Sequence, residues 1–269
     1  MRWWRWTYID HVASFLNLDG PLVIAHRGGA ALACENSDTA FARSVGLGVR
    51  VLESDIRTTA DGVPILHHDA DLTRVAHYGA KIEDIDWDEI SGIRLPDDGR
   101  LMRLDEALTA WPGIRWNLDV KDDRSVQPTV DTLLRTQALD RVCVSSFSNG
   151  RLIRLRAALG ARVATGATWR EALAILRVPV WRGRMARNWR GEGDVGPVAV
   201  QVPPSHRGLP LLTRGSVAAA HELGLAVQAW TINSADQMQR LLEMGVDGLV
   251  TDDPALALEV LAAATTAQS

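Results

Sequence analysis

Apolar runs typical of buried strands alternate along this chain with segments in which apolar residues recur at helical spacing. Strands that are apolar on both faces are typical of a parallel sheet covered by helices. We predict eight strands, at residues 21–25, 51–56, 115–120, 142–147, 162–166, 198–202, 226–231 and 248–251. Eight strand–helix units close into a (β/α)8 barrel of the TIM type, which is the α/β fold that we expect.

Helical spacing predicts seven helices between these strands, at residues 37–47, 104–111, 126–136, 150–159, 169–176, 213–223 and 235–244. Ser37 or Asn36 is expected to cap the first of them. One segment departs from the alternation, because a turn at 59–62 joins the second strand to another extended run at 63–68. This pattern predicts an antiparallel hairpin. The polar stretch at 72–103 would then lie over the barrel mouth.

One domain is the simplest organisation of these elements. We expect the barrel at residues 21–261, with a hairpin and cap insertion at 57–103, a Trp/Arg-rich lead segment at 1–20 and a frayed tail at 262–269. A hydrophobic content of 46% in 269 residues suits one large core. A net charge of -4 gives no reason to expect nucleic-acid binding.

Cysteine usage and hydropathy suggest a location. Cys34 and Cys143 are the only cysteines and lie far apart in sequence, which excludes a disulfide framework and suits a reducing compartment. No run is apolar for long enough to span a bilayer, and no apolar signal core follows the basic N-terminus. We therefore expect a cytoplasmic protein.

Two clusters of tryptophan and arginine qualify that expectation. Trp3, Trp4 and Trp6 form the first, while Trp181 and Trp189 lie in the basic segment 181–190, ahead of a glycine-rich loop at 188–196. They are either surface side chains or a site of peripheral membrane contact, where indole rings lie at the headgroup level beside arginines.

Polar residues with metal-binding chemistry lie in the second and third predicted strands. Residues Glu53 and Asp55 are one residue apart, so strand alternation places both on one side, and Asp119 lies near the end of the next strand. Active sites of such barrels lie at the carboxyl ends of the strands. We expect these three carboxylates to hold one divalent cation, Mg²⁺ or Ca²⁺, as a cofactor, rather than to form a solvated polar edge.

Two histidines stand beside charged groups at strand ends. His26 and His68 are candidates for general acid–base catalysis, since an imidazole titrates near neutral pH. His67 would point to the opposite face of its extended segment. Arg27 and Lys121 could neutralise a phosphoryl group, although Lys121 could instead pair with the neighbouring aspartate.

Three further residues complete the predicted site. Glu35 would face Arg27 and orient it. Trp230 would form either an apolar wall for a small polyol or part of the barrel core. Gly28 would let the backbone approach a ligand closely.

These residues occur in a series of motifs. The motifs are His26-Arg27-Gly28, Glu35-Asn36-Ser37, Glu53-x-Asp55, Asp61-Gly62, His68-Asp69-x-x-Leu72-x-Arg74, Asp119-x-Lys121, Trp230-Thr231-Ile232-Asn233 and Gly245-Val246-Asp247-Gly248 followed by Thr251-Asp252-x-Pro254. Together, and in this order over residues 22–254, they resemble the motifs of the glycerophosphodiester phosphodiesterase family.

The resemblance implies a TIM-type barrel that hydrolyses glycerophosphodiesters, a small-molecule substrate, to sn-glycerol 3-phosphate and an alcohol. It also implies a catalytic pair, His26 and His68, and a route in which a neighbouring glycerol hydroxyl attacks first and water then opens a cyclic phosphate. Two departures stand out: Cys34 replaces the usual proline, and Asp119 replaces a glutamate as the third metal ligand.

Two alternatives remain open. The first is a lysophospholipase D-type enzyme that acts on lysophospholipids at a membrane surface, which the Trp/Arg clusters suggest. The second is a barrel that binds a phosphodiester without cleaving it, which the full set of candidate catalytic groups argues against.

Overall fold

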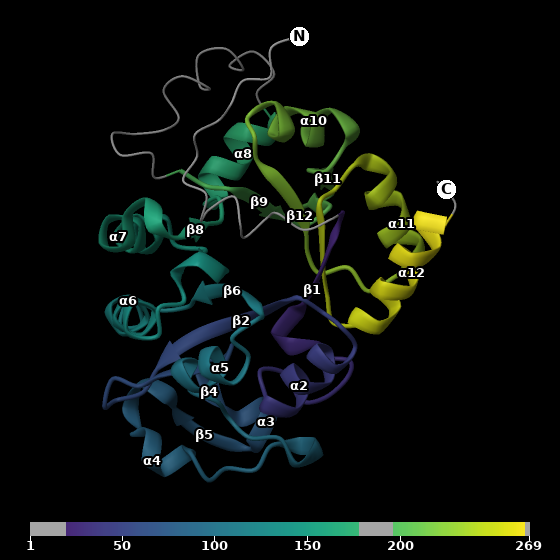
Figure 1. Cartoon of the computed structure of the whole chain (residues 1–269). Coiled ribbons are helices and arrows are strands. Elements are labelled where there is room, and N and C mark those ends of the chain that lie inside the picture. Colours follow the sequence, from purple (N-terminus) through teal and green to yellow (C-terminus); the bar gives the residue numbers. More distant parts are fainter. Residues whose placement is uncertain (1–19, 178–195, 267–269) are drawn as a thin grey trace.

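The computed structural model describes residues 20–177 and 196–266, and within these ranges eight parallel strands form a barrel (Figure 1). The barrel strands are β1 (Leu22–Ala25), β2 (Val51–Thr58), β6 (Arg115–Val120), β7 (Val142–Ser145), β8 (Ala164–Thr165), β9 (Ala199–Val202), β12 (Ala226–Ala229) and β13 (Gly248–Thr251). They pair in the order β8-β7-β6-β2-β1-β13-β12-β9. A parallel bridge between Gly166 and Ala199 joins the two ends of this order. The predicted strands and the TIM-type barrel are confirmed.

Helices surround the barrel. They are α2 (Asp38–Gly46), α5 (Leu104–Ala110), α6 (Val126–Arg135), α7 (Asn149–Leu159), α8 (Trp169–Arg177), α10 (Arg214–Glu222), α11 (Ala235–Met244) and α12 (Pro254–Thr266). The first seven match the predicted helices, and Ser37 caps α2 by accepting from Ala40 N at 3.1 Å. Helix α12 was not predicted, because its sequence is apolar almost all round and lacks helical periodicity. Because α12 extends to Thr266, residues 262–266 are helical, and the expectation of a frayed tail there is wrong.

The predicted hairpin leads into an excursion at residues 57–103, the blue-to-teal lower part of Figure 1. Its elements are β3 (Pro64–Leu66), β4 (Asp71–Leu72), α3 (Thr73–Ala76), β5 (Tyr78–Lys81) and α4 (Trp87–Ile90). Strand β3 pairs antiparallel with β2, as expected. The excursion has a small core of its own, made of Ile65, Leu72, Val75, Ile82, Ile85, Ile90, Leu95 and Leu101.

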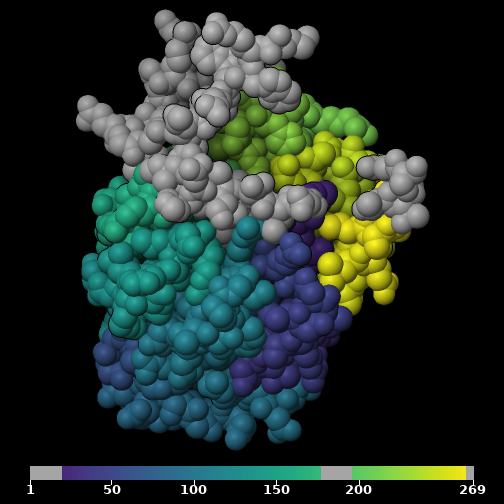
Figure 2. All heavy atoms as spheres, in the orientation of Figure 1, coloured from purple at the N-terminus to yellow at the C-terminus, as the bar shows by residue number. Residues whose placement is uncertain are grey.

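Figure 2 shows the atoms of this excursion continuous with those of the first, purple β/α unit. Within residues 57–103 only His68 lines the pocket described below. The excursion therefore flanks the pocket, and the expectation that it covers the barrel mouth is wrong. Its own apolar core explains this position, because those side chains pack on one another rather than across the mouth.

Two apolar regions hold the barrel together. Outside it, the fully buried Trp116 of β6 packs against Phe41 of α2 and Trp111, with ring centroids 5.1 and 6.2 Å away. Truncating such a side chain to alanine costs roughly 3–5 kcal/mol. Inside it, the floor consists of Leu22, Ile24, Val51, Cys143, Ala164, Val198, Ala199 and Val250.

The Trp/Arg clusters at Trp3, Trp4 and Trp6 and at Trp181 and Trp189 lie outside the described residues, so membrane contact through them stays a prediction. In the described part of the chain, no helix is long and apolar enough to cross a bilayer. A two-stranded hairpin of β10 (Ser205–His206) and β11 (Leu209–Pro210) precedes α10.

Candidate active site

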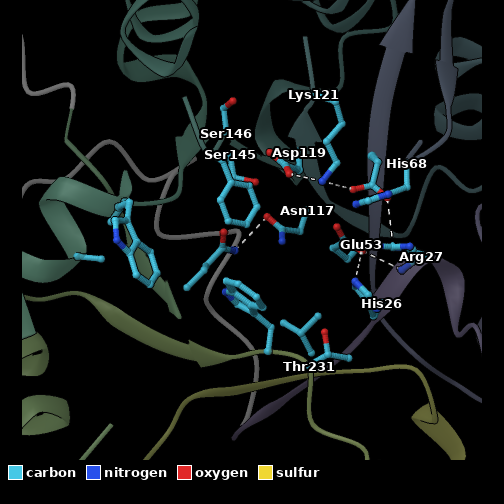
Figure 3. A pocket seen from close by; sticks show the side chains of 18 residues that line it. His26, Arg27, Glu53, His68, Asn117, Asp119, Lys121, Ser145, Ser146 and Thr231 are labelled. Carbon is cyan, nitrogen blue, oxygen red and sulfur yellow. Dashed lines mark hydrogen bonds and ion pairs between the residues drawn. The ribbon is translucent and has the colours of Figure 1, made fainter. Parts of the chain in front are cut away.

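A cavity of about 230 Å³ opens at the carboxyl ends of the barrel strands (Figure 3). All predicted site residues except Glu35 and Gly28 line it, namely His26, Arg27, Glu53, Asp55, His68, Asp119, Lys121 and Trp230. Strand register explains their convergence. In the parallel pair β2–β6, Asp55 lies opposite Asp119 and Glu53 lies opposite Asn117, so that alternate residues of both strands point inward together.

The ammonium of Lys121 lies between two carboxylates. Its Nζ is 2.8 Å from Asp55 Oδ1 and 2.7 Å from Asp119 Oδ2. Burial raises the pKa of Asp55, but Lys121 and Arg27 outweigh it and hold that pKa below its ordinary value. Burial dominates at Asp119, whose pKa is raised. Lys121 thus pairs with Asp119, which was the predicted alternative to phosphate binding. It also lines the pocket, where a phosphate could reach it.

At Glu53, the favourable contacts of the carboxylate do not offset the effect of burial on its pKa. Burial and then repulsion from Asp55 raise its pKa to about 7, although its Oε2 accepts from Arg27 N at 2.8 Å. Asp119 Oδ1 is buried without a hydrogen-bond partner. Burial thus outweighs the neighbouring positive charges at Glu53 and Asp119, whose pKa values are raised.

The raised pKa values and the unpartnered oxygen bear on the expected cation. Among the described residues, no three acidic, histidine or cysteine side chains are arranged as a metal cluster, and Lys121 stands between Asp55 and Asp119. The donor chemistry nonetheless fits a hard cation, since buried carboxylate oxygens are its preferred ligands and one of them has no partner.

A tight turn after β1 brings the first motif into the pocket. Arg27 has a φ of 50°, and Gly28 has a φ of 83°. A Cβ on Gly28 would lie 2.6 Å from Phe41, so the position requires glycine for both backbone and packing reasons. The absent side chain of Gly28 thus faces α2, and the approach of its backbone to a ligand stays a prediction.

His26 is held by the last barrel strand. Its Nδ1 lies 2.6 Å from Asp252 Oδ1, and its Nε2 lies 4.0 Å from Glu53 Oε2. Burial lowers the pKa of His26, but the hydrogen bond to Asp252 and the charge of Glu53 outweigh it, and the pKa is raised. Figure 3 shows the His26 ring beside Glu53, with a dashed line joining the two side chains.

The two adjacent histidines point to opposite faces, as predicted. His68 lines the pocket, and its Nδ1 lies 2.7 Å from Asp69 Oδ1. His67 is buried away from it, with its Nε2 2.9 Å from Asp71 O. Burial lowers the pKa of His67, which favours a neutral structural ring.

Behind the pocket wall, Glu35 accepts from Arg27 Nη1 at 2.9 Å, which agrees with the predicted orienting contact. Arg27 Nε also lies 3.5 Å from Asp55 Oδ2. Burial raises the pKa of Glu35, but Arg74 and Arg27 outweigh it and lower that pKa, so Glu35 is ionised near neutral pH.

Aromatic rings form the other side of the pocket. Trp230 packs edge-on against Phe147 at 5.8 Å between ring centroids, and Lys121 Nζ lies 5.5 Å from the Phe147 centroid. Phe147 is 64% exposed. Trp169, at the start of α8, also lines the cavity. Trp230 is therefore part of a pocket wall and not of the sealed core.

Sequence reasoning gave no role to several of these residues. They are Asn117, Phe147, Trp169 and Gln201, which line the cavity, and Asp252, which contacts His26. Strand alternation could have identified four of them. Asn117 and Gln201 lie two residues from other inward-facing positions of their strands, and Phe147 and Asp252 continue the same alternation just beyond the ends of theirs. Trp169 comes from a helix and carries no such signal.

With this geometry in place, comparisons with known proteins are informative. A model of the glycerophosphoryl diester phosphodiesterase family matches residues 26–256. The protein named probable glycerophosphodiester phosphodiesterase 2 of Mycobacterium tuberculosis is 36% identical over 251 residues, 93% of this chain and 94% of its own. Lysophospholipase D GDPD1 of Homo sapiens is 23% identical, over 86% of this chain and 83% of its own.

Solved structures share the fold. A phosphodiesterase of Oleispira antarctica, in complex with the product sn-glycerol-3-phosphate, superimposes with a TM-score of 0.75 at 21% identity, over 90% of this chain and 97% of its own. A glycerophosphodiester phosphodiesterase of Agrobacterium tumefaciens gives a TM-score of 0.73 at 20% identity, over 90% and 99%.

Proposed function

The chain belongs to the glycerophosphoryl diester phosphodiesterase family, and we propose that it hydrolyses glycerophosphodiesters to sn-glycerol 3-phosphate and an alcohol. The observation that carries this proposal is one pocket with two histidines, an arginine, a lysine and three carboxylates. Such groups can transfer protons and neutralise charge, and phosphodiester cleavage needs both.

Proton transfer falls to His26 and His68. One imidazole takes the proton of the attacking oxygen, and the other gives a proton to the leaving alcohol as its bond to phosphorus breaks. The attacking oxygen is the neighbouring glycerol hydroxyl, and water then opens the resulting cyclic phosphate. Support comes from the carboxylates that hold the two rings, Asp252 and Asp69.

Arg27 and Lys121 contact the phosphate in this proposal. Both are cations on the pocket wall, and Glu35 orients the first of them. Trp230 forms an apolar wall for the carbon atoms of the glycerol. These residues bind and orient the substrate without exchanging protons with it.

Glu53, Asp55 and Asp119 would hold Mg²⁺ or Ca²⁺. When bound, such a cation supplies Lewis-acid stabilisation of a phosphate oxygen. The raised pKa values of Glu53 and Asp119 and the unpartnered Asp119 oxygen support this assignment. Lys121 keeps the buried pair of aspartates partly neutralised before a cation or a phosphate arrives.

A second candidate substrate is a lysophospholipid. The exposed Phe147 beside Trp230 favours it, because an apolar rim next to the reacting groups could contact an acyl chain. The polar groups of the pocket would have the same roles for this substrate.

The deciding experiment measures products from glycerophosphocholine and from lysophosphatidylcholine, first with EDTA and then with Mg²⁺ or Ca²⁺ restored. Metal-dependent release of sn-glycerol 3-phosphate from the first substrate supports the main proposal. Release of choline from the acylated substrate alone would favour the second candidate. No product from either substrate, with a correctly folded protein, would contradict both.

A further inference from the structure

Arg74 connects two carboxylates, Asp69 and Glu35, that belong to separate sequence motifs and each contact a pocket residue. Its Nε donates to Asp69 Oδ2 at 2.7 Å, and its two terminal nitrogens donate to the two oxygens of Glu35 at 2.8 and 2.7 Å. Asp69 is the partner of His68, and Glu35 is the partner of Arg27. Five side chains thus form a continuous chain from a pocket histidine to a pocket arginine.

We propose that Arg74 is a positioning residue that sets the imidazole of His68 and the guanidinium of Arg27 relative to each other. This inference rests on the proposed function, in which these two groups transfer a proton and hold the phosphate. Arg74 does not line the cavity and reaches the reaction only through Asp69 and Glu35.

The charges along the chain suit this role. Burial raises the pKa of Asp69, but its hydrogen bonds to His68 and Arg74 and their positive charges together outweigh this and lower the pKa to about 2. Glu35 is also kept ionised by its two arginines. Both carboxylates therefore accept hydrogen bonds throughout the neutral pH range. A guanidinium matches a carboxylate with two parallel hydrogen bonds, which a lysine ammonium cannot reproduce.

The excursion anchors this residue. Arg74 lies in the short helix α3, and its neighbours Leu72 and Val75 are buried in the excursion core, at 0% and 7% exposure. The backbone is thus fixed, while the Arg74 side chain is 49% exposed on the outside of the pocket wall. An ion pair this exposed adds little to stability, so its main consequence is the placement of its partners.

The test compares Arg74→Ala with Arg74→Lys and with Arg100→Ala. Arg100 is a matched control, since it is 45% exposed and also bridges two carboxylates, Asp38 and Glu106, but neither of these contacts the pocket. We expect Arg74→Ala to lower kcat/KM about 10- to 100-fold, because a small misplacement of reacting groups can cost up to about 100-fold. Arg74→Lys should restore little, and Arg100→Ala should behave as the wild type.

Two further measurements separate positioning from general structural damage. Added guanidinium ion should rescue the turnover of Arg74→Ala and not that of His68→Ala. Combining Arg74→Ala with Asp69→Asn should cost less than the product of the single effects, because both remove one link. Wild-type kcat and KM in Arg74→Ala would overturn the proposal, as would a folded variant that guanidinium leaves unchanged.

Binding of sn-glycerol 3-phosphate by calorimetry gives a readout that needs no turnover. Weaker binding in Arg74→Ala, with unchanged binding in Arg100→Ala, supports the effect on Arg27. Equal binding in both variants contradicts it. A wild-type protein that binds this ligand without turning over any diester would contradict the proposed function alone.

Discussion

His26 Nδ1 and Asp252 Oδ1 lie 2.6 Å apart although 226 residues separate them in sequence. The second Asp252 oxygen accepts from Asn233 Nδ2 at 2.6 Å, and Asn233 Oδ1 accepts from Asp252 N at 2.9 Å. The carboxylate is thus held on both sides. A ring that uses Nδ1 for this contact presents Nε2 toward Glu53 and the pocket.

Asp252→Asn should lower kcat by about tenfold or more, because an amide leaves the His26 ring poorly oriented. His26→Ala should lower it further, by about 10²–10⁴-fold, the usual contribution of a general acid or base. Steady-state kinetics on glycerophosphocholine measures both.

The control for Asp252→Asn is Asp247→Asn. Asp247 also pairs with a histidine, His221, at 2.8 Å, but it precedes strand β13, away from the pocket. Its variant should keep its turnover. Equal losses in the two aspartate variants would mean that general stability, and not ring orientation, sets the activity.

The neighbouring histidines should respond in opposite ways. His68→Ala should lose about 10²–10⁴-fold in kcat with little change in the free energy of unfolding. His67→Ala should keep most of its activity and lose roughly 1–3 kcal/mol of stability, because it empties a buried site. Denaturant unfolding and kinetics on the same samples check both, and reversed outcomes would exchange the roles of the two residues.

Mg²⁺ or Ca²⁺ should stabilise the wild-type protein and not Asp55→Asn. Ligand at 100 times its Kd adds about 2.7 kcal/mol to folding stability, which thermal unfolding detects readily. Asp123→Asn is the control, since its side chain is 68% exposed and lies outside the cavity. Wild-type protein that neither cation stabilises at millimolar concentration would remove the proposed metal site.

The metal-free protein should lose stability as the pH rises. Burial and Asp55 raise the pKa of Glu53 from 4.5 to about 7 in the folded state. A raised pKa contributes stability that is complete below the unfolded value and is lost as the pH passes the folded value. Each pH unit between these two pKa values corresponds to about 1.4 kcal/mol. His26, whose pKa is also raised, acts in the same direction.

Thermal unfolding in EDTA at several pH values between about 5 and 8 measures this loss. Glu53→Gln, which cannot ionise, should show a flatter profile than the wild type. Identical profiles for the two proteins would show that Glu53 does not carry the pH dependence.

Local pattern was enough for most of the fold. The alternation of apolar strands with amphipathic helices identified all eight barrel strands, because each pattern reflects burial on a fixed side of one element. Helix α12 was not predicted, because it is apolar almost all round and therefore shows no helical periodicity. The cap at Ser37 and the β2–β3 hairpin depend on contacts within a few residues, and both were confirmed. The family resemblance rested on motifs over nearly the whole chain and is confirmed as well.

The sequence by itself determined the barrel, the family and the residue types that face one another at the ends of neighbouring strands, since strand register and alternation are periodic and local. Only the tertiary structure decided which partners those residues find in distant parts of the chain. It brought Asp252 to His26 across the closure of the barrel and placed Lys121 between two aspartates. It also used Arg74 of the excursion to connect Asp69 with Glu35. Such contacts depend on how distant elements pack in three dimensions, and no local spacing of residues encodes them.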